Sequence, residues 1–381
     1  MTQAILAIPT GAIDARPNLL HRALGNPRML IGGSFVLIVV LACVLTLPAT
    51  LSADSEFYYN RQRSTHVRTP PEATLIGLFG YDALGRSILA RCLLGGALSI
   101  LIGCSAAAIA VVLGVTVGLV AGYRGGWVDA VLMRAVDILY GLPYILLVVL
   151  FKVGLEPNVV NGSWFPVLVL LAAFAAVGGI TFWLDGRREA ALDRRLARIR
   201  STFVLIAAVV LGWPLLRGFV ARLMPGFEVK PDTAGIVILF VAIGMVGWLT
   251  MARVVRGQVL SLREMPFIEA GRAMGLPPHR IFLRHVLPNL VGPITVYATL
   301  TVPAAILQES FLSFLGVGVR LPLPTWGNLA SEGVAALTPV KFYWWMLTFP
   351  CLLLMTTLLS LNFLGDGLRD LIDAKNDAAE L

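Results

Sequence analysis

The stretch EAGRAMGLPPHRIFLRHVLPN, Glu269–Asn289, lies between two long apolar runs and is itself short, basic and interrupted by prolines. Its first part, EAGRAM, consists mostly of good helix formers, and Gly275 is typical of the residue that ends a helix. Pro277 and Pro278 prevent simple continuation of that helix. HRIFLRHVL then predicts a second helix, and Pro288 begins the next apolar run. The stretch therefore predicts two short helices joined by a turn, with small side chains on the first.

The sequence around this stretch has the composition of a membrane protein. Of its 381 residues, 57% are hydrophobic and 14% are charged, and the surface of an ordinary soluble domain carries far more charge. A helix needs roughly 20 apolar residues to cross the hydrocarbon core of a bilayer. Eight runs reach about this length: 29–48, 96–121, 130–151, 164–184, 201–220, 234–252, 290–313 and 342–364. The sequence thus predicts an all-α polytopic membrane protein with eight spans.

Basic residues predict the orientation of these spans, because loops rich in Lys and Arg stay in the cytoplasm. The N-terminal tail, the 185–200 loop and residues 253–285 are rich in Arg, whereas the connections 152–163, 221–233 and 314–341 hold one or two basic residues each. We therefore expect both termini and the polar stretch on the cytoplasmic side. The net charge of +8 is interpreted as a signal of topology, and no nucleic-acid partner is expected.

A ridge of small residues is predicted on one face of the second span. Gly114, Gly118 and Gly122 recur every four residues, and such faces let helix backbones approach closely in lipid. Packing inside the same chain is at least as well supported by this pattern as a dimer interface.

Two carboxylates lie near the ends of predicted spans. Asp137 follows Arg134 by three residues, so the two are expected to pair at the inner boundary. Glu309 lies near the outer end of the seventh run, and a snorkelling or salt-bridged structural role is expected for it.

Neither a metal site nor a catalytic site is indicated. The four histidines are scattered, and Cys43, Cys92, Cys104 and Cys351 share no metal-like spacing. These cysteines are expected to be small buried hydrophobic residues. No nucleophile–base constellation is evident, which disfavours a membrane enzyme.

From the residues alone, the polar stretch has several interpretations. It can be a docking segment for another protein, an interfacial amphipathic helix, a DNA-binding helix-turn-helix or a plain solvated loop. Its short apolar face disfavours the interfacial helix, and its position between two spans disfavours DNA binding. The docking segment and the solvated loop remain as interpretations.

The stretch resembles the cytoplasmic EAA signature of ABC-importer permease subunits. The matching positions are Glu269, Ala270, Gly275, Leu287 and Pro288. Gly271 replaces the usual third Ala, and His285 stands where many families have Ile, but RHVLPN is similar to the form found in the dipeptide/oligopeptide branch. Further segments resemble that branch in order along most of 75–373: YDALGRSILARCLLG (81–95), AGYRGGWVDAVLMRAVDILYGLP (121–143), ESFLSFLGVG (309–318), PTWGNLASEG (324–333) and GDGLRD (365–370).

This resemblance implies the transmembrane fold of an ABC type I importer, with six family spans and two more inserted within 153–221. It divides the chain into five parts: a cytoplasmic tail (1–28), a first span (29–48), a periplasmic or extracellular segment (49–92), a permease domain (93–373) and a cytoplasmic tail (374–381). The cytoplasmic segment 257–288 would be the coupling segment, which sits in a groove of a separate ATPase.

The resemblance also implies partners. They are a homologous second permease, two ABC ATPase subunits, an extracytoplasmic binding protein and the lipid of a bacterial inner membrane. The chain has no G-x-x-x-x-G-K-[ST] phosphate loop, so it is expected to need no cofactor itself, with ATP and Mg bound by the partner ATPases.

Particular residues follow from the same match. Contact with the ATPase is expected at Glu269, Ala270, Gly271 and Gly275, with Arg284 and His285 orienting the second helix. Leu287 and Pro288 complete the expected ATPase-coupling loop. Trp326 and Gly327, in an outward loop, are candidates for contact with the binding protein, and anchoring of that loop is the structural alternative. Peptide import is the function expected, nickel import of the same family is an alternative, and an ATP-independent channel or secondary transporter is a third.

Overall fold

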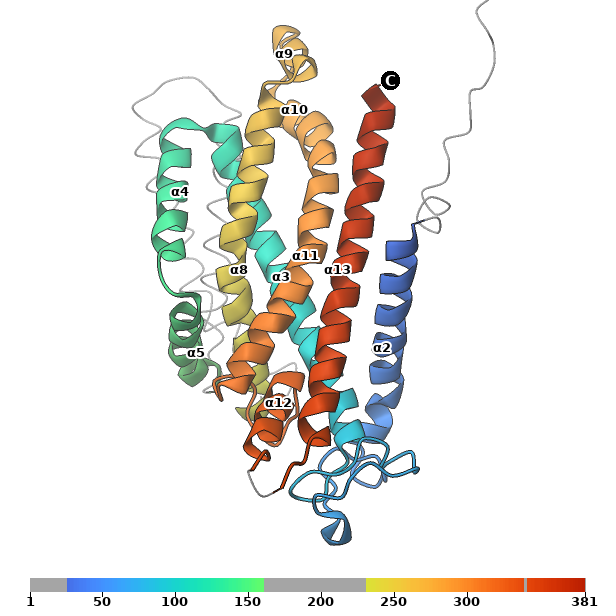
Figure 1. Cartoon of the computed structure of the whole chain (residues 1–381). Helices are drawn as coiled ribbons and strands as arrows, with labels where there is room; N and C mark the ends of the chain where they lie inside the picture. The colour runs from blue at the N-terminus through green and yellow to red at the C-terminus, as the bar shows by residue number, and fades with distance from the viewer. Residues whose placement is uncertain (1–25, 161–230, 339–340, 381) are drawn as a thin grey trace, which may run out of the picture.

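The computed structural model describes residues 26–160, 231–338 and 341–380, and there the chain is helical with two isolated β-bridges. Figure 1 shows long helices running side by side, with α9 and α10 at one end and α12 at the other. The elements are α2 (Pro27–Leu51), η1 (Ser64–His66), α3 (Ile88–Arg124), α4 (Gly126–Tyr140), α5 (Tyr144–Val160), α8 (Pro231–Arg263), α9 (Pro266–Ala273), α10 (Pro278–Ile281), the π-helical turn η2 (Phe282–Val286), α11 (Leu287–Phe314), α12 (Trp326–Ala335) and α13 (Trp345–Glu380).

Several helices begin where the sequence supplies a cap. The Ser87 side chain accepts a hydrogen bond from the backbone N–H of Ala90 at the start of α3. The Thr325 side chain and Asn328 form a reciprocal capping box at the start of α12. These contacts satisfy N–H groups that have no partner inside the helix, so local sequence alone fixes both starting points.

Among the described residues, five helices are long and apolar enough to cross a membrane, and a bent pair of helices makes a sixth candidate. Six of the eight runs expected from the sequence coincide with these elements. The runs 164–184 and 201–220 lie outside the described residues.

The 130–151 run does not form the single straight span that its length predicts. It contains two helices, α4 and α5, which meet at an angle of 95°. The cause is local: Gly141 follows the last helical residue, and Pro143 disfavours helical geometry at Leu142.

The glycine ridge packs inside the chain. A Cβ added at Gly118 would lie 2.6 Å from the carbonyl oxygen of Ala252, and one at Gly122 would lie 2.8 Å from Val259 Cβ. Gly114 meets Met251 in the same way. The small residues of α3 therefore let its backbone pack closely against α8. The sequence left open packing within the chain and a dimer interface, and the structure shows packing within the chain.

Asp137 has a different partner from the one expected. Its carboxylate accepts a hydrogen bond from Arg253 of α8 at 2.8 Å, so the expected pairing with Arg134 is wrong. The Arg253 guanidinium also lies 4.1 Å from the centre of the Tyr140 ring. One turn further along α8, Arg256 pairs with Asp129. Both ion pairs tie α4 to α8, which the spacing within α4 could not reveal.

Glu309 is fully buried, with 0% of its surface exposed, so the expected snorkelling role is wrong, and the expected salt bridge is also not found in the described residues. Its carboxylate accepts hydrogen bonds from the hydroxyls of Ser99 (3.0 Å) and Ser313 (2.6 Å), and in the described residues no cation forms a salt bridge with it. Ser99 Oγ in turn accepts from the backbone N–H of Trp326, and Ser313 Oγ from that of Val319. Hydroxyls on α3 and α11 thus replace water around the carboxylate.

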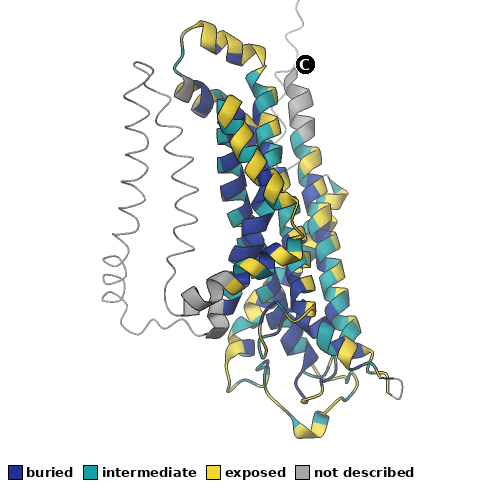
Figure 2. Ribbon diagram, turned by 90° about the vertical axis from the view of Figure 1, so that its left-hand side faces the viewer, coloured by how far each residue is buried: buried dark blue, intermediate teal, exposed yellow. Residues whose placement is uncertain are grey.

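The cysteines are free, but they are not all buried. Cys43 and Cys92 are buried as expected, whereas Cys351 is half-buried and Cys104 is exposed. Figure 2 shows that exposed residues extend along the length of the helices as well as at the ends. Large apolar side chains such as Leu45 and Met355 are among them, as expected for helices that face lipid or a partner in the membrane.

Candidate functional site

The predicted coupling segment forms a small helical unit at one end of the bundle (Figure 1). Its helix α9 starts at Pro266, whose missing N–H costs nothing at a first helical position. Ile268 is 1% exposed and anchors α9 in a cluster of apolar side chains. The other buried members come from α8, α10, η2 and α11: Met251, Val255, Val259, Ile281, Phe282, Val286 and Leu290. One apolar cluster thus connects α9 to the ends of α8 and α11.

Gly275 ends α9 in the way that the sequence predicts. Its φ is +74°, the left-handed region that favours glycine. The N–H of Gly275 donates to the carbonyl of Arg272 at 3.0 Å, and the N–H of Leu276 donates to that of Gly271 at 3.1 Å. This pair of bonds is the Schellman motif, and it sets the direction in which the chain leaves α9.

Gly271 faces the inside of the unit. A Cβ added there would lie 3.5 Å from Leu276 Cδ1 and 3.7 Å from Ile281 Cγ1, which is ordinary van der Waals contact. The departure from the usual Ala at this position therefore leaves space that a methyl group would fill without displacing a neighbour.

We expect Gly271→Ala to keep uptake within about twofold of wild type and to raise rather than lower stability, because Ala favours a helix over Gly by up to about 1 kcal/mol. The measurements are solute uptake and the melting temperature of the purified protein. Gly118→Ala is the matched control: its methyl group would meet the Ala252 carbonyl, so this variant should melt at a lower temperature. A loss of uptake in Gly271→Ala at an unchanged melting temperature would contradict the prediction.

The surface of α9 that points away from the bundle combines charge with exposed apolar side chains. We define the α9 outer face as Met265, Phe267, Glu269, Ala270, Arg272, Ala273 and Met274, all of which are exposed. Met274 is 73% exposed, and much of α9 has the colour of exposed residues in Figure 2. Exposed apolar groups gathered on one short helix indicate an interaction site.

The remaining residues of the signature lie beside α9. Arg284 is exposed and His285 is half-buried, with its ring centre 6.4 Å from that of Phe267. Leu287 is half-buried and Pro288 is exposed at the start of α11. Pro288 has no N–H to donate to the turn before it, which favours the wide π-helical turn there. The structure thus brings Glu269, Ala270, Gly271, Gly275 and His285 into one unit, with Arg284 and Pro288 at its edge.

At the opposite end of the bundle, a buried ionic cluster joins the segment before α3 to α12. Arg91 donates to Asp82 at 2.7 Å and to both carboxylate oxygens of Glu332, at 2.5 and 2.8 Å. Arg86 pairs with the same two acids, at 2.7 Å from Asp82 and 3.5 Å from Glu332. We call these four residues the outer ionic cluster.

Trp326 and Gly327 form the buried start of α12. Trp326 is 1% exposed, and its indole N–H donates to the carbonyl of Cys92 at 3.1 Å. A Cβ at Gly327 would lie 2.1 Å from the Ser310 carbonyl oxygen. Both residues hold α12 against α3 and α11, a geometry that favours the anchoring alternative. Contact of these two residues with a binding protein stays a prediction.

Sequence reasoning did not identify two parts of these sites. The apolar members of the α9 outer face were missed, although Met265, Phe267 and Met274 interrupt an otherwise polar stretch and so offered a signal. The outer ionic cluster was also missed: Arg91 lies shortly before the apolar run 96–121, and nothing in the sequence indicates that Glu332 is its partner.

Comparisons with known proteins show which family the chain resembles. The model of the family described as "Binding-protein-dependent transport system inner membrane component" matches residues 114–377. The dipeptide transport system permease protein DppC of Bacillus subtilis is 32% identical over 94% of this chain and 88% of its own. The oligopeptide transport system permease protein OppC of Escherichia coli K12 is 33% identical over 95% of this chain and 91% of its own length. The protein of the same name from Haemophilus influenzae is 33% identical over 78% of this chain and 70% of its own length.

Proposed function

Because the chain belongs to the family of binding-protein-dependent transport system inner membrane components, we propose that it is a permease subunit of an ATP-driven importer of short peptides. We choose peptides as the solute because the chain is similar, over nearly its whole length, to permeases named for dipeptide and oligopeptide transport. Nickel is the alternative cargo of the same architecture, and these relatives do not favour it.

In this proposal the α9 outer face sits in a groove of a separate ATPase. The support is mechanical: α9 is exposed on its outer side, and its inner side is held by Ile268 to the ends of α8 and α11. Closure of two ATPase subunits around ATP and Mg would move α9, and the shared apolar cluster would pass that movement to the spans. Hydrolysis takes place in the ATPases, and this chain forms half of the pathway.

The remaining partners are a homologous second permease and an extracytoplasmic binding protein. We place both termini and the coupling segment in the cytoplasm and α12 on the side of the binding protein. The proposal keeps eight spans. The inserted pair, 164–184 and 201–220, is even in number, so each later span retains its orientation and the Arg-rich 185–200 loop stays inside.

The proposal is tested by purifying the chain from its own cells in mild detergent and identifying what comes with it. A second multi-span permease and ATPases with a phosphate loop are expected. After reconstitution into vesicles, the complex should take up a tripeptide only with ATP and the binding protein. A chain that purifies alone and moves solute without ATP is instead a channel or secondary transporter, and that result would exclude the proposed function.

A further inference from the structure

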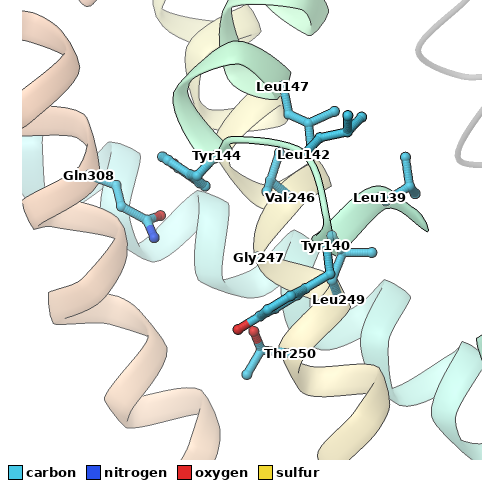
Figure 3. A pocket seen from close by; sticks show the side chains of 10 residues that line it. All are labelled: Leu139, Tyr140, Leu142, Tyr144, Leu147, Val246, Gly247, Leu249, Thr250 and Gln308. Carbon is cyan, nitrogen blue, oxygen red and sulfur yellow. The ribbon is translucent and has the colours of Figure 1, made fainter. Parts of the chain in front are cut away.

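A pocket of about 360 Å³ lies where the bent pair α4–α5 meets α8 and α11 (Figure 3). Its lining includes Tyr140 and Tyr144 on either side of the bend, Val246 and Thr250 of α8, and Gln308 of α11. The volume is near the lower end of the range of about 300 to 1,000 Å³ that is usual for ligand sites. The pocket is therefore large enough for part of a ligand.

The pocket lies within the membrane-spanning part of the bundle. Thr250 is near the middle of the candidate span Gly235–Arg263, and the bend itself falls within the pair Gly126–Tyr140 and Tyr144–Val153. Non-helical backbone at this depth is tolerated where it is buried in protein or lines a cavity. In transporters, interrupted helices often mark the substrate site. The depth and the bend both favour a place on the solute pathway.

The chemistry of the lining is apolar and neutral. Leu147 and the two tyrosine rings offer apolar surface, and none of the ten described residues that line the pocket is charged. Tyr144 Oη is buried and has no hydrogen-bond partner among the described residues. Gln308 lines the same pocket from α11, the helix that faces the bend (Figure 3). A buried hydroxyl without a partner costs about 1–3 kcal/mol, so this pocket is better matched to a ligand that can hydrogen-bond than to a hydrocarbon chain.

We propose that this pocket is a subsite for an uncharged part of a peptide in transit. An apolar side chain packs between the tyrosine rings and the leucines, while Gln308 and the Tyr144 hydroxyl bind main-chain N–H and C=O groups. Every peptide carries those groups, so such a site accepts many sequences and discriminates mainly against charge. This inference rests on the proposed function, because it takes peptides as the solute.

The test introduces charges of opposite sign at one lining position. Gln308→Glu and Gln308→Lys are reconstituted with the partner subunits, and the maximum uptake rates of Ala-Lys-Ala and Ala-Glu-Ala are compared at saturating binding protein. Maximum rates are used because the binding protein sets the apparent affinity. Like charges repel within a poorly solvated site, so Gln308→Glu should shift the ratio of the two rates toward Ala-Lys-Ala, and Gln308→Lys should shift it toward Ala-Glu-Ala, each by about tenfold.

Gln258 provides a matched control, because it is exposed at the cytoplasmic end of α8 and is not among the residues that line the pocket. Gln258→Glu and Gln258→Lys should leave the ratio unchanged. If the Gln308 variants fail to assemble, Thr250→Asp and Thr250→Lys make the same test at an exposed lining position. Opposite shifts support the subsite. If the Glu and Lys variants shift the ratio of uptake rates in the same direction, or not at all, in complexes that melt at the wild-type temperature, the subsite is overturned. A wild-type complex that imports no peptide overturns the proposed function itself.

Discussion

Replacing Gly275 by proline is expected to reduce ATP-driven uptake at least tenfold while the complex still assembles in the membrane. Gly275 has a φ of +74°, whereas proline is fixed near −65° and lacks the N–H that donates to Arg272. Proline would also disfavour the helical conformation of Met274, the C-cap of α9. The substitution therefore changes where α9 ends and the direction in which the chain leaves it, and no membrane span is altered. Uptake and ATP hydrolysis by reconstituted complexes are the measurements, and hydrolysis should continue without uptake.

Two variants define the cause of that loss. Gly275→Ala adds a methyl group that meets no atom within 4 Å, so its cost is the backbone conformation alone, about 1–2 kcal/mol, and uptake should be reduced only in part. Glu269→Lys, in the exposed first turn of α9, puts positive charge where the helix dipole favours negative charge, and it alters the α9 outer face. It should uncouple hydrolysis from uptake as Gly275→Pro does. Normal uptake by both Gly275→Pro and Glu269→Lys would refute the coupling role.

Arg91→Ala is expected to lower the melting temperature of the purified complex by roughly 5 to 15 °C. The change leaves the buried Asp82 with Arg86 alone and removes the two-pronged contact with Glu332. Breaking a buried ion pair by removing one partner costs about 3–5 kcal/mol, and each kcal/mol corresponds to a few degrees in a protein of this size. Because α12 is held at this point, binding-protein-dependent uptake should fall as well.

An exposed ion pair in the same chain serves as the control. Arg28 and Asp370 approach to 3.6 Å with both side chains exposed, so Arg28→Ala should change the melting temperature by no more than about one or two degrees. Arg91→Lys keeps the charge but loses the forked geometry, and it should fall between wild type and Arg91→Ala. Equal melting temperatures for Arg91→Ala and Arg28→Ala would mean that the outer ionic cluster does not stabilise α12.

The sequence by itself determined features that depend on neighbours along the chain. Six of the apolar runs coincide with helical elements of the structure, five as single long helices and the run 130–151 as the bent pair α4–α5, since crossing a bilayer is a matter of local length and composition. Gly275 and the two prolines after it predicted where α9 ends, since φ preference belongs to single residues. The EAA-like spacing identified the segment that the structure places at the tip of the bundle.

Only the tertiary structure decided which residues meet across the bundle. Asp137 pairs with Arg253 rather than with its neighbour in sequence, and Glu309 is buried among hydroxyls contributed in part by α3. The glycine ridge meets α8, and the 95° bend of α4 and α5 forms a pocket only because α8 and α11 face it. The spacing of small and polar residues in the sequence shows which face of a helix carries them. The partner of that face is set by packing between segments more than a hundred residues apart in the chain.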